Sequence, residues 1–539
     1  MTTKHDAIII GAGHNGLVCA NYLARAGLKV LVLERRHIVG GAAVTEEIAP
    51  GFRASIFSYL MSILHPRIQT DLNLRAHGLT VMPCSDMLSP LGDDYIIFSD
   101  DVRRTQTSFS RFNKADADIY PEFDRALADT TEVFRKLLWE TPFDPTKRDW
   151  KTFKQAAGFA LRNRKYGRKF FDVAKLVTMS AYDFLSEWFE DDRIKAVLAY
   201  YASIGTFAGP RSPGSAYVIL HHIIGENAGA GGWGFIRGGM GAISESLASA
   251  ARANGVEILT DAGIKRIETP MGRVGCVVTT DGQTFSAPVV ASNANAKILF
   301  FDLVGADNLP EEFVRDLNGY RTMSTAFKMN IAAERPPQYA CLPRANRDRA
   351  LGNWNYPTYV HVAPDIDYLE RAYDDAKYGG YSRNPFITPV VPTIVDDTLA
   401  PAGKHVVNLF GGHAPYKLRD REWSCERDNF QKTVLDTMDA FAPGFSDDII
   451  EAQMLLPEDI ERIVNLPQGH IFQGELSTDQ LFNFRPVPHW ADYRTPIGGL
   501  YLCGASVHPG GGVSGIPGYN AAREILRDLG KKSNMRFAS

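Results

Sequence analysis

The stretch AIIIGAGHNG, at residues 7–16, decides the fold expected for this chain. It opens with four apolar residues, a run typical of a strand buried on both faces of a parallel sheet. The glycines Gly11, Gly13 and Gly16 then follow with the spacing G-x-G-x-x-G. We expect Gly11 to permit a tight turn, Gly13 to let the backbone approach a phosphate, and Gly16 to let helix and strand pack closely.

The residues that follow complete a strand–helix–strand unit. Residues 17–26 are predicted to form a helix that ends at Gly27, and residues 29–33 a second strand that ends on Glu34. The helix N-terminus suits a pyrophosphate, and an acid ~20 residues further on accepts ribose hydroxyls. The unit therefore predicts a dinucleotide site. Glu34 disfavours a 2′-phosphate, so the alternatives are FAD and NAD.

The residues after Glu34 favour FAD. Arg35 leads within a few positions to Gly40, Gly41 and Ala42, whereas a plain NAD domain would continue into its next helix. A glycine doublet so soon after the ribose acid indicates backbone that folds back toward the phosphates.

The C-terminal region points to the same ligand. A short apolar strand ends at Gly504, and six glycines occupy residues 504–518, among them Gly512 and Gly515. Such a density of glycine suits a chain pressed against a large flat ligand. A helix that begins after Val513 would aim its N-terminus at negative charge on that ligand.

Composition excludes several other functions. The 539 residues carry 58 basic and 62 acidic side chains, and a net charge of −4 gives no electrostatic footprint for nucleic acid. The six cysteines form no CxxC pair and no metal-ligand spacing, which argues against zinc and thiol redox chemistry and favours a reducing, cytoplasmic location.

The sequence predicts a soluble or membrane-peripheral protein. We find no signal peptide and no apolar run of the ~18 residues that a spanning helix needs. A basic stretch at residues 162–169, followed by Phe170 and Phe171, is compatible with an anionic membrane surface. A solvated helix face is the interpretation that we favour for it. A homo-oligomer is also compatible with the sequence.

Several motifs carry a family resemblance. GAGHNGL, LERR and GGAAVTEE near the N-terminus and FRPVPHWADYRTPIGGLYLCGASVHPGGGVSGIPGYNAA near the C-terminus resemble the phytoene desaturase branch of FAD-dependent oxidoreductases. Within it, the likeness is closest to the pyridine nucleotide-disulphide oxidoreductase domain-containing protein 2 group. It covers most of the chain, including SEWFEDDRIKAVLA, GGWGFIRGGMGAISESL and LPQGHIFQGELSTDQLFNFRP. The group's name suggests disulphide chemistry, for which this sequence lacks paired cysteines.

The resemblance implies an α/β fold with a discontinuous Rossmann-type FAD domain and an inserted substrate domain with a mixed sheet and helices. We expect the FAD domain at residues 1–75, 232–300 and 486–530, the substrate domain at 76–231 and 301–485, and a tail at 531–539. The glycine-rich stretch 225–241 would return the chain to the FAD domain. By the same resemblance, backbone near Ile264 would hold the adenine edge.

Two residues are candidates for catalysis. Residues 325–331 alternate as a strand would, which places Lys328 on the face opposite Phe327. The stretch is similar to a strand of amine oxidases whose lysine holds a water against flavin N5; the alternative is an exposed lysine. His508 could protonate a substrate or line the flavin, and we favour the alternative that it caps a turn.

The expected function is hydride transfer between flavin N5 and a carbon of a small, apolar, unsaturated molecule of isoprenoid or lipid type. One alternative is a flavin amine or amino-acid oxidase, for which Trp233, Trp354, Tyr356 and Tyr359 could form an aromatic cage. Another is a flavin-holding interaction protein without turnover. The family's substrates are too varied for the motifs to name one.

Overall fold

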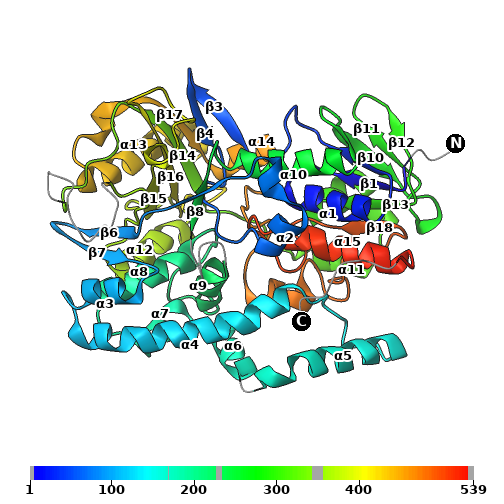
Figure 1. Cartoon of the computed structure of the whole chain (residues 1–539), viewed down its shortest axis with the longest axis horizontal. Coiled ribbons are helices and arrows are strands. Elements are labelled where there is room, and N and C mark those ends of the chain that lie inside the picture. The colour runs from blue at the N-terminus through cyan, green and yellow to red at the C-terminus, as the bar shows by residue number, and fades with distance from the viewer. Residues whose placement is uncertain (1–4, 168, 226–232, 343–355, 532–539) are drawn as a thin grey trace.

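A five-stranded parallel sheet carries the glycine motif (Figure 1). The computed structural model describes residues 5–167, 169–225, 233–342 and 356–531. Within it the strand order is β18-β13-β1-β2-β9, and every neighbouring pair is parallel. The strands are β1 (Ala7–Ile10), β2 (Val30–Leu33), β9 (Glu257–Leu259), β13 (Val289–Ser292) and β18 (Leu500–Leu502). All five come from the three segments expected to form the FAD domain.

Helices pack closely beside this sheet. Helix α1 (His14–Arg25) lies between α10 (Gly241–Ala253) and α15 (Ile516–Asp528) and contacts both. Gly518 makes the α1–α15 contact possible, because a Cβ there would lie 2.0 Å from the carbonyl oxygen of Asn15. A three-stranded antiparallel sheet of β10 (Ile264–Glu268), β11 (Cys276–Thr279) and β12 (Thr284–Phe285) lies at the outer end of this region in Figure 1.

A second, antiparallel sheet lies in the segment predicted to form the substrate domain. Its order is β15-β16-β14-β17, made of β14 (Phe327–Ala333), β15 (Ile387–Val390), β16 (His405–Gly411) and β17 (Ile449–Leu455). The predicted alternation is present in β14: Phe327, Met329 and Ile331 share a core with α13 (Trp423–Phe441). Every residue of β14 is buried, including those on the opposite face.

Helices and short hairpins complete the fold. Helices α7 and α8 bury apolar side chains of the predicted substrate domain, among them Leu185, Ile194 and Tyr201. The other helices are α2 (Pro66–Asp71), α3 (Val102–Phe109), α4 (Lys114–Leu138), α5 (Trp150–Asn163), α6 (Lys169–Thr178), α7 (Ala181–Ser186), α8 (Asp192–Ser203), α9 (Ala216–Ile223), α11 (Glu311–Asn318), α12 (Ile366–Lys377) and α14 (Pro457–Val464).

The remaining strands pair outside the two main sheets. They are β3 (Thr45–Ala49) with β4 (Phe52–Ser55), β5 (Val81–Pro83) with β8 (Gly234–Ile236), and β6 (Met87–Leu91) with β7 (Asp94–Phe98). Residues 226–232 of the glycine-rich stretch lie outside the described residues. Among the helices of the described chain, none is both long enough and apolar enough to cross a membrane.

The contact between α1 and α15 gives a test of the fold. Gly518→Ala should lower the free energy of unfolding by about 1–3 kcal/mol, because the added methyl group meets backbone that cannot move aside alone. Urea denaturation of the variant measures the change. Gly167→Ala is a matched control, since the nearest atom to its added Cβ lies at 3.7 Å. Equal urea midpoints for the two variants would contradict the close contact between Gly518 and the Asn15 carbonyl oxygen.

Candidate functional site

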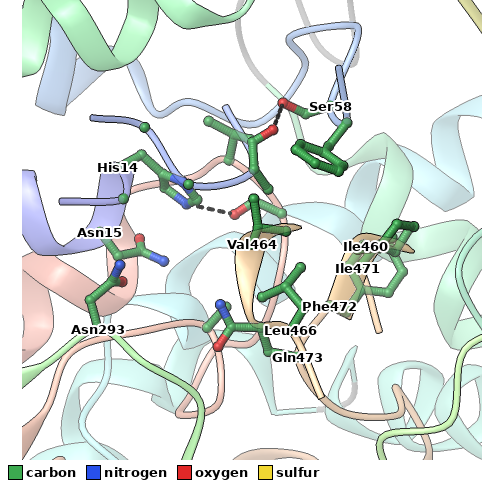
Figure 2. Close-up of a pocket in the computed structure, with 18 of the residues that line it drawn as sticks. His14, Asn15, Ser58, Asn293, Ile460, Val464, Leu466, Ile471, Phe472 and Gln473 are labelled. Carbon is green, nitrogen blue, oxygen red and sulfur yellow. Dashed lines mark hydrogen bonds between the residues drawn. The ribbon is translucent and has the colours of Figure 1, made fainter. Parts of the chain in front are cut away.

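A cavity of about 310 Å³ is lined from both main sheets (Figure 2). Ile10 and Leu33 border it at the ends of β1 and β2, and Phe327 and Phe410 border it from β14 and β16. Most of the predicted cofactor residues line it: Gly11, Gly13, Glu34, Arg35, Gly40, Gly41, Ala42, Ile264, Gly512 and Val513. The cavity therefore brings together glycine clusters from the N-terminal and C-terminal regions, with Ile264 from the middle of the chain.

Three predicted cofactor residues, Gly16, Gly504 and Gly515, are not among the described residues that line the cavity. Gly16 has the packing role that its place in the motif predicted, and Gly504 also packs against protein. A Cβ at Gly16 would lie 2.2 Å from the carbonyl oxygen of Gly11, and one at Gly504 would lie 2.5 Å from that of Asn293. Gly515 precedes α15 with a φ of +75°, a conformation that glycine adopts most readily. These glycines shape the site without facing a ligand.

Asn293, which follows β13, is a cavity residue to which the sequence analysis gave no role. Its side chain faces the glycine turn: a Cβ at Gly13 would lie 2.6 Å from its Nδ2, and one at Gly11 3.5 Å from its Cβ. Figure 2 shows Asn293 beside Asn15 and His14. The available signal was its position directly after β13, the fourth strand of the sheet in chain order, since the carboxyl ends of parallel strands converge on a crevice.

Glu34 is held in place by two backbone N–H groups. Its Oε2 accepts from Ala12 N at 2.7 Å, and its Oε1 accepts from Arg36 N at 2.9 Å. The first bond ties the end of β2 to the glycine turn after β1. Each carboxylate oxygen keeps a second acceptor position, so the oriented side chain can still accept from ribose hydroxyls.

Buried polar atoms in the cavity wall lack protein partners. Asn15 Oδ1 and Gln473 Oε1 have no hydrogen-bond partner within the described part of the chain, and both residues line the cavity. Helix α1 follows Gly13, which has no side chain to cap the free N–H groups. Unpaired acceptors and an uncapped helix N-terminus are groups that a bound dinucleotide would satisfy.

His14 joins the two ends of the chain across the cavity wall. Its Nε2 lies 3.1 Å from the carbonyl oxygen of Gly512, and because a carbonyl only accepts, Nε2 donates (Figure 2). Burial lowers the pKa of His14 to about 4, although the bond to Gly512 opposes that shift. His14 is therefore neutral near pH 7 and links the glycine turn to the C-terminal glycine cluster without adding charge.

Lys328 lies in the cavity wall, and the alternative of an exposed lysine is wrong, because only 2% of the residue is exposed. Its Nζ donates to the Ser55 carbonyl oxygen at 3.0 Å, to Asn408 Oδ1 at 2.9 Å and to Asn330 Oδ1. An ammonium has three N–H donors, so these acceptors take all of them. The geometry leaves no donor for a water beside a flavin. Three acceptors around Nζ are the surroundings expected of an ammonium group fixed in the cavity wall.

The electrostatics of Lys328 are unusual. Burial lowers its pKa well below the ordinary value of a lysine, and its acceptors are neutral amide oxygens rather than carboxylates. The Tyr59 ring, which also lines the cavity, lies 5.4 Å from Nζ. Three oriented acceptors favour the charged form, whereas desolvation opposes it. A buried cation of this kind acts on any charge that develops in the cavity.

His508 is not among the residues that line the cavity of the described chain. Its Nε2 donates to the Leu137 carbonyl oxygen at 3.0 Å, and its ring stacks on Phe482 at 5.1 Å between centroids. Burial lowers the pKa of His508 to about 4. The predicted catalytic role therefore has no geometric support, and the alternative of a structural histidine in a turn fits the contacts.

His221 and His222, at the end of α9, line the cavity and were missed by the sequence analysis. His222 Nδ1 donates to the Val218 carbonyl oxygen at 2.8 Å, so the neutral ring carries its lone pair on Nε2. Burial lowers the pKa of His222 to about 4. The signal was an adjacent histidine pair at the end of the otherwise apolar segment AYVILHHI.

Of the aromatic residues considered for a cage, the structure describes Trp233, Tyr356 and Tyr359, and only Trp233 of these lines the cavity. Trp233 lines it and stacks on His222 at 6.4 Å between centroids. Tyr359 packs behind Trp233 at 5.9 Å, and Tyr356 lies in the core beneath the antiparallel sheet. Trp354 lies outside the described residues.

Two cysteines far apart in the sequence meet in the structure. Cys19 in α1 and Cys503 after β18 are both fully buried, and burial, with the neighbouring Cys19 thiol, raises the pKa of Cys503 well above its ordinary value. Neither lines the cavity within the described chain. Both thiols lack the exposure of reactive thiols, and the raised pKa of Cys503 opposes formation of its thiolate.

Comparison with known proteins identifies the class. Residues 16–359 match the family described as flavin containing amine oxidoreductase. The chain is 38% identical to pyridine nucleotide-disulfide oxidoreductase domain-containing protein 2 of Rattus norvegicus, over 98% of this chain and 94% of that protein. It is 24% identical to a lycopene-forming phytoene desaturase of Pantoea ananas, over 97% and 99% of the two chains.

A solved structure of putrescine oxidase has the same fold, with a TM-score of 0.60 at 15% identity over 98% of this chain and 99% of that one. The fold is thus that of a flavoprotein oxidoreductase, which confirms the predicted α/β class and the family resemblance. The chain belongs to the flavin containing amine oxidoreductase family, and its cofactor is a flavin.

The contacts of Lys328 give a second test. Lys328→Met should lower the free energy of unfolding by about 1–3 kcal/mol, because three buried oxygens lose their donor. Urea denaturation measures this loss of free energy. The double variant Lys328→Met with Asn408→Leu should lose less free energy of unfolding than the sum of the losses of the two single variants. Lys404→Met, at a partly exposed lysine paired with Glu334, is the control. Additive effects of Lys328→Met and Asn408→Leu would contradict the contact.

Proposed function

We propose that this protein is an FAD-dependent oxidoreductase that transfers hydride equivalents between flavin N5 and a carbon of an apolar, unsaturated substrate. The family supports a flavin enzyme, and the choice of FAD rests on the dinucleotide-type wall of the cavity. The wider likeness to a phytoene desaturase supports an isoprenoid or lipid-like substrate.

The chain's own residues fit FAD. The uncapped N-terminus of α1 and the glycine turn at Gly13 would hold the pyrophosphate, and Glu34 would accept from the ribose. Backbone at Gly512 and Val513 would border the flavin, since both residues line the cavity just before α15. A Cβ at Gly512 would lie 2.3 Å from Ile63 Cδ1, so a larger residue there would fill the cavity wall.

The charge of the cavity lining carries the choice of substrate. Among the described residues that line it, Glu34 is the only carboxylate, and its remaining acceptor positions would be taken by the ribose of FAD. Lys328 and Arg35 contribute positive charge to the same lining, whereas the charge of Arg36 is paired with Glu46. A cationic amine would therefore meet like charges and no available counterion, whereas a neutral apolar molecule would not.

The rest of the lining suits an apolar molecule. Ile204, Trp233, Ile471 and Phe472 supply apolar and aromatic surface that excludes water (Figure 2 shows the last two). Removal of a hydride from one carbon must be accompanied by loss of a proton from its neighbour if a double bond forms. Nε2 of His222, which carries a lone pair, is a group in this wall that could accept that proton.

FAD binding is tested through Glu34. The protein should purify yellow and release free FAD when denatured with acid. Glu34→Ala should raise the dissociation constant of FAD roughly ten- to a hundredfold, because it removes the ribose acceptor and frees the N–H groups of Ala12 and Arg36. Titration of the apoprotein with FAD measures it. Glu312→Ala, at an exposed residue of α11, is the control, and equal affinities in the two variants would refute the role of Glu34.

The substrate class is tested by flavin bleaching without oxygen. We expect a neutral unsaturated isoprenoid to react with the flavin. It should either reduce the oxidised flavin, which bleaches it, or oxidise the reduced flavin, which restores its colour. Primary amines and amino acids should do neither, because the lining offers them no free carboxylate. Bleaching by amines alone would establish C–N oxidation instead. No response to any compound would favour a flavin-holding protein without turnover.

A further inference from the structure

A positively charged, apolar segment lies at the edge of the molecule. We define the α5 arm as residues 147–171, which include α5 and lie between α4 and most of α6. The arm has nine basic residues and one acidic residue, a net charge of +8, whereas the whole chain has a net charge of −4. Figure 1 shows α5 along the lower edge, outside both main sheets.

The α5 arm also exposes large apolar side chains. Eleven large hydrophobic residues are exposed in the described part of the chain, and four of them belong to the arm: Trp150 (67%), Phe153 (60%), Leu161 (64%) and Phe171 (78%). Trp150 and Phe153 stack on each other at 5.2 Å between centroids instead of packing into the core. So much exposed aromatic surface in one short segment indicates an interaction site.

The three exposed apolar residues of α5 lie on one side of the helix. At about 100° per residue, Trp150, Phe153 and Leu161 fall within roughly 80° of the helix circumference. Lys154 lies next to this face, with Nζ 5.4 Å from the centre of the Trp150 ring. An apolar face bordered by lysine and arginine is typical of a helix that lies in a membrane interface.

The positive charge of the arm is partly offset by helix α4. Arg162 is paired with Glu140, Lys165 with Glu132, and Lys169 with Asp129. Within the described residues, no acidic partner is found for Arg148, Lys154 or Arg164, which are all exposed. These cations remain available for an external anionic surface.

We propose that the α5 arm docks the protein on the surface of an anionic lipid bilayer. The apolar face would enter the headgroup region while the surrounding cations face the phosphates. A second copy of the chain is a poorer occupant, because two arms brought face to face would oppose their positive charges. The inference goes beyond the proposed reaction and does not depend on it.

Vesicle flotation of the purified flavoprotein tests the proposal. The protein should float with vesicles of phosphatidylcholine mixed with phosphatidylglycerol and should float poorly with phosphatidylcholine alone. Trp150→Ser combined with Phe153→Ser should lower the partition coefficient roughly tenfold, because the apolar anchor is lost. Lys154→Glu combined with Arg164→Glu should lower it similarly, and high salt should reduce binding of the unchanged protein.

Matched controls separate the arm from surface changes in general. Met271→Ser with Tyr378→Ser removes two apolar side chains exposed elsewhere, and Arg252→Glu with Lys265→Glu reverses two exposed charges elsewhere. Neither pair should change flotation. Equal flotation on both lipid mixtures, or arm variants that float like the unchanged protein, would overturn the proposal. Arm variants that alter only the sedimentation coefficient would overturn it in favour of contact between copies of this chain.

Discussion

The convergence of backbone at Asn293 is the constraint on which the site depends. The glycine turn after β1, the end of β13 and the end of β18 meet there at distances that leave no room for a Cβ at Gly13 or Gly504. Because parallel strands end at one edge of a sheet, segments from both ends of the chain reach this point. The hydrogen bond from His14 to Gly512 also joins the N-terminal glycine turn to the C-terminal glycine cluster, at another side of the cavity.

The chemistry of the cavity follows from how its two walls differ. The parallel-sheet wall presents backbone N–H groups and Glu34, as a dinucleotide requires. The antiparallel-sheet wall presents apolar side chains and one buried cation, Lys328, whose acceptors are all neutral. In its protonated form Lys328 would repel other cations strongly, because an apolar surrounding screens charge poorly, and the proposed preference for a neutral substrate rests on this. The fold alone, which is shared with an amine oxidase, does not make this distinction.

Local sequence patterns predicted the strands, the helix and the turn that form the backbone of the site. The strand at Ala7–Ile10, the helix after it and the acid Glu34 were readable because their spacing is a property of one βαβ unit. The strand that carries Lys328 was readable from its alternation. The packing role of Gly16 was readable from its place in the G-x-G-x-x-G motif, whereas that of Gly504 was not, because it depends on contact with Asn293, more than 200 residues away.

The sequence by itself therefore determined the fold class, the dinucleotide turn and the flavoprotein family, since each rests on short-range spacing or on motifs in a fixed order. Only the tertiary structure decided the surroundings of side chains. It placed His222 in the cavity and left His508 outside. It brought Ser55 and Asn408 from other strands to Lys328, beside Asn330 of the same strand, and it left Trp150 exposed on α5. Burial and partners depend on contacts between residues hundreds of positions apart, and no local pattern encodes them.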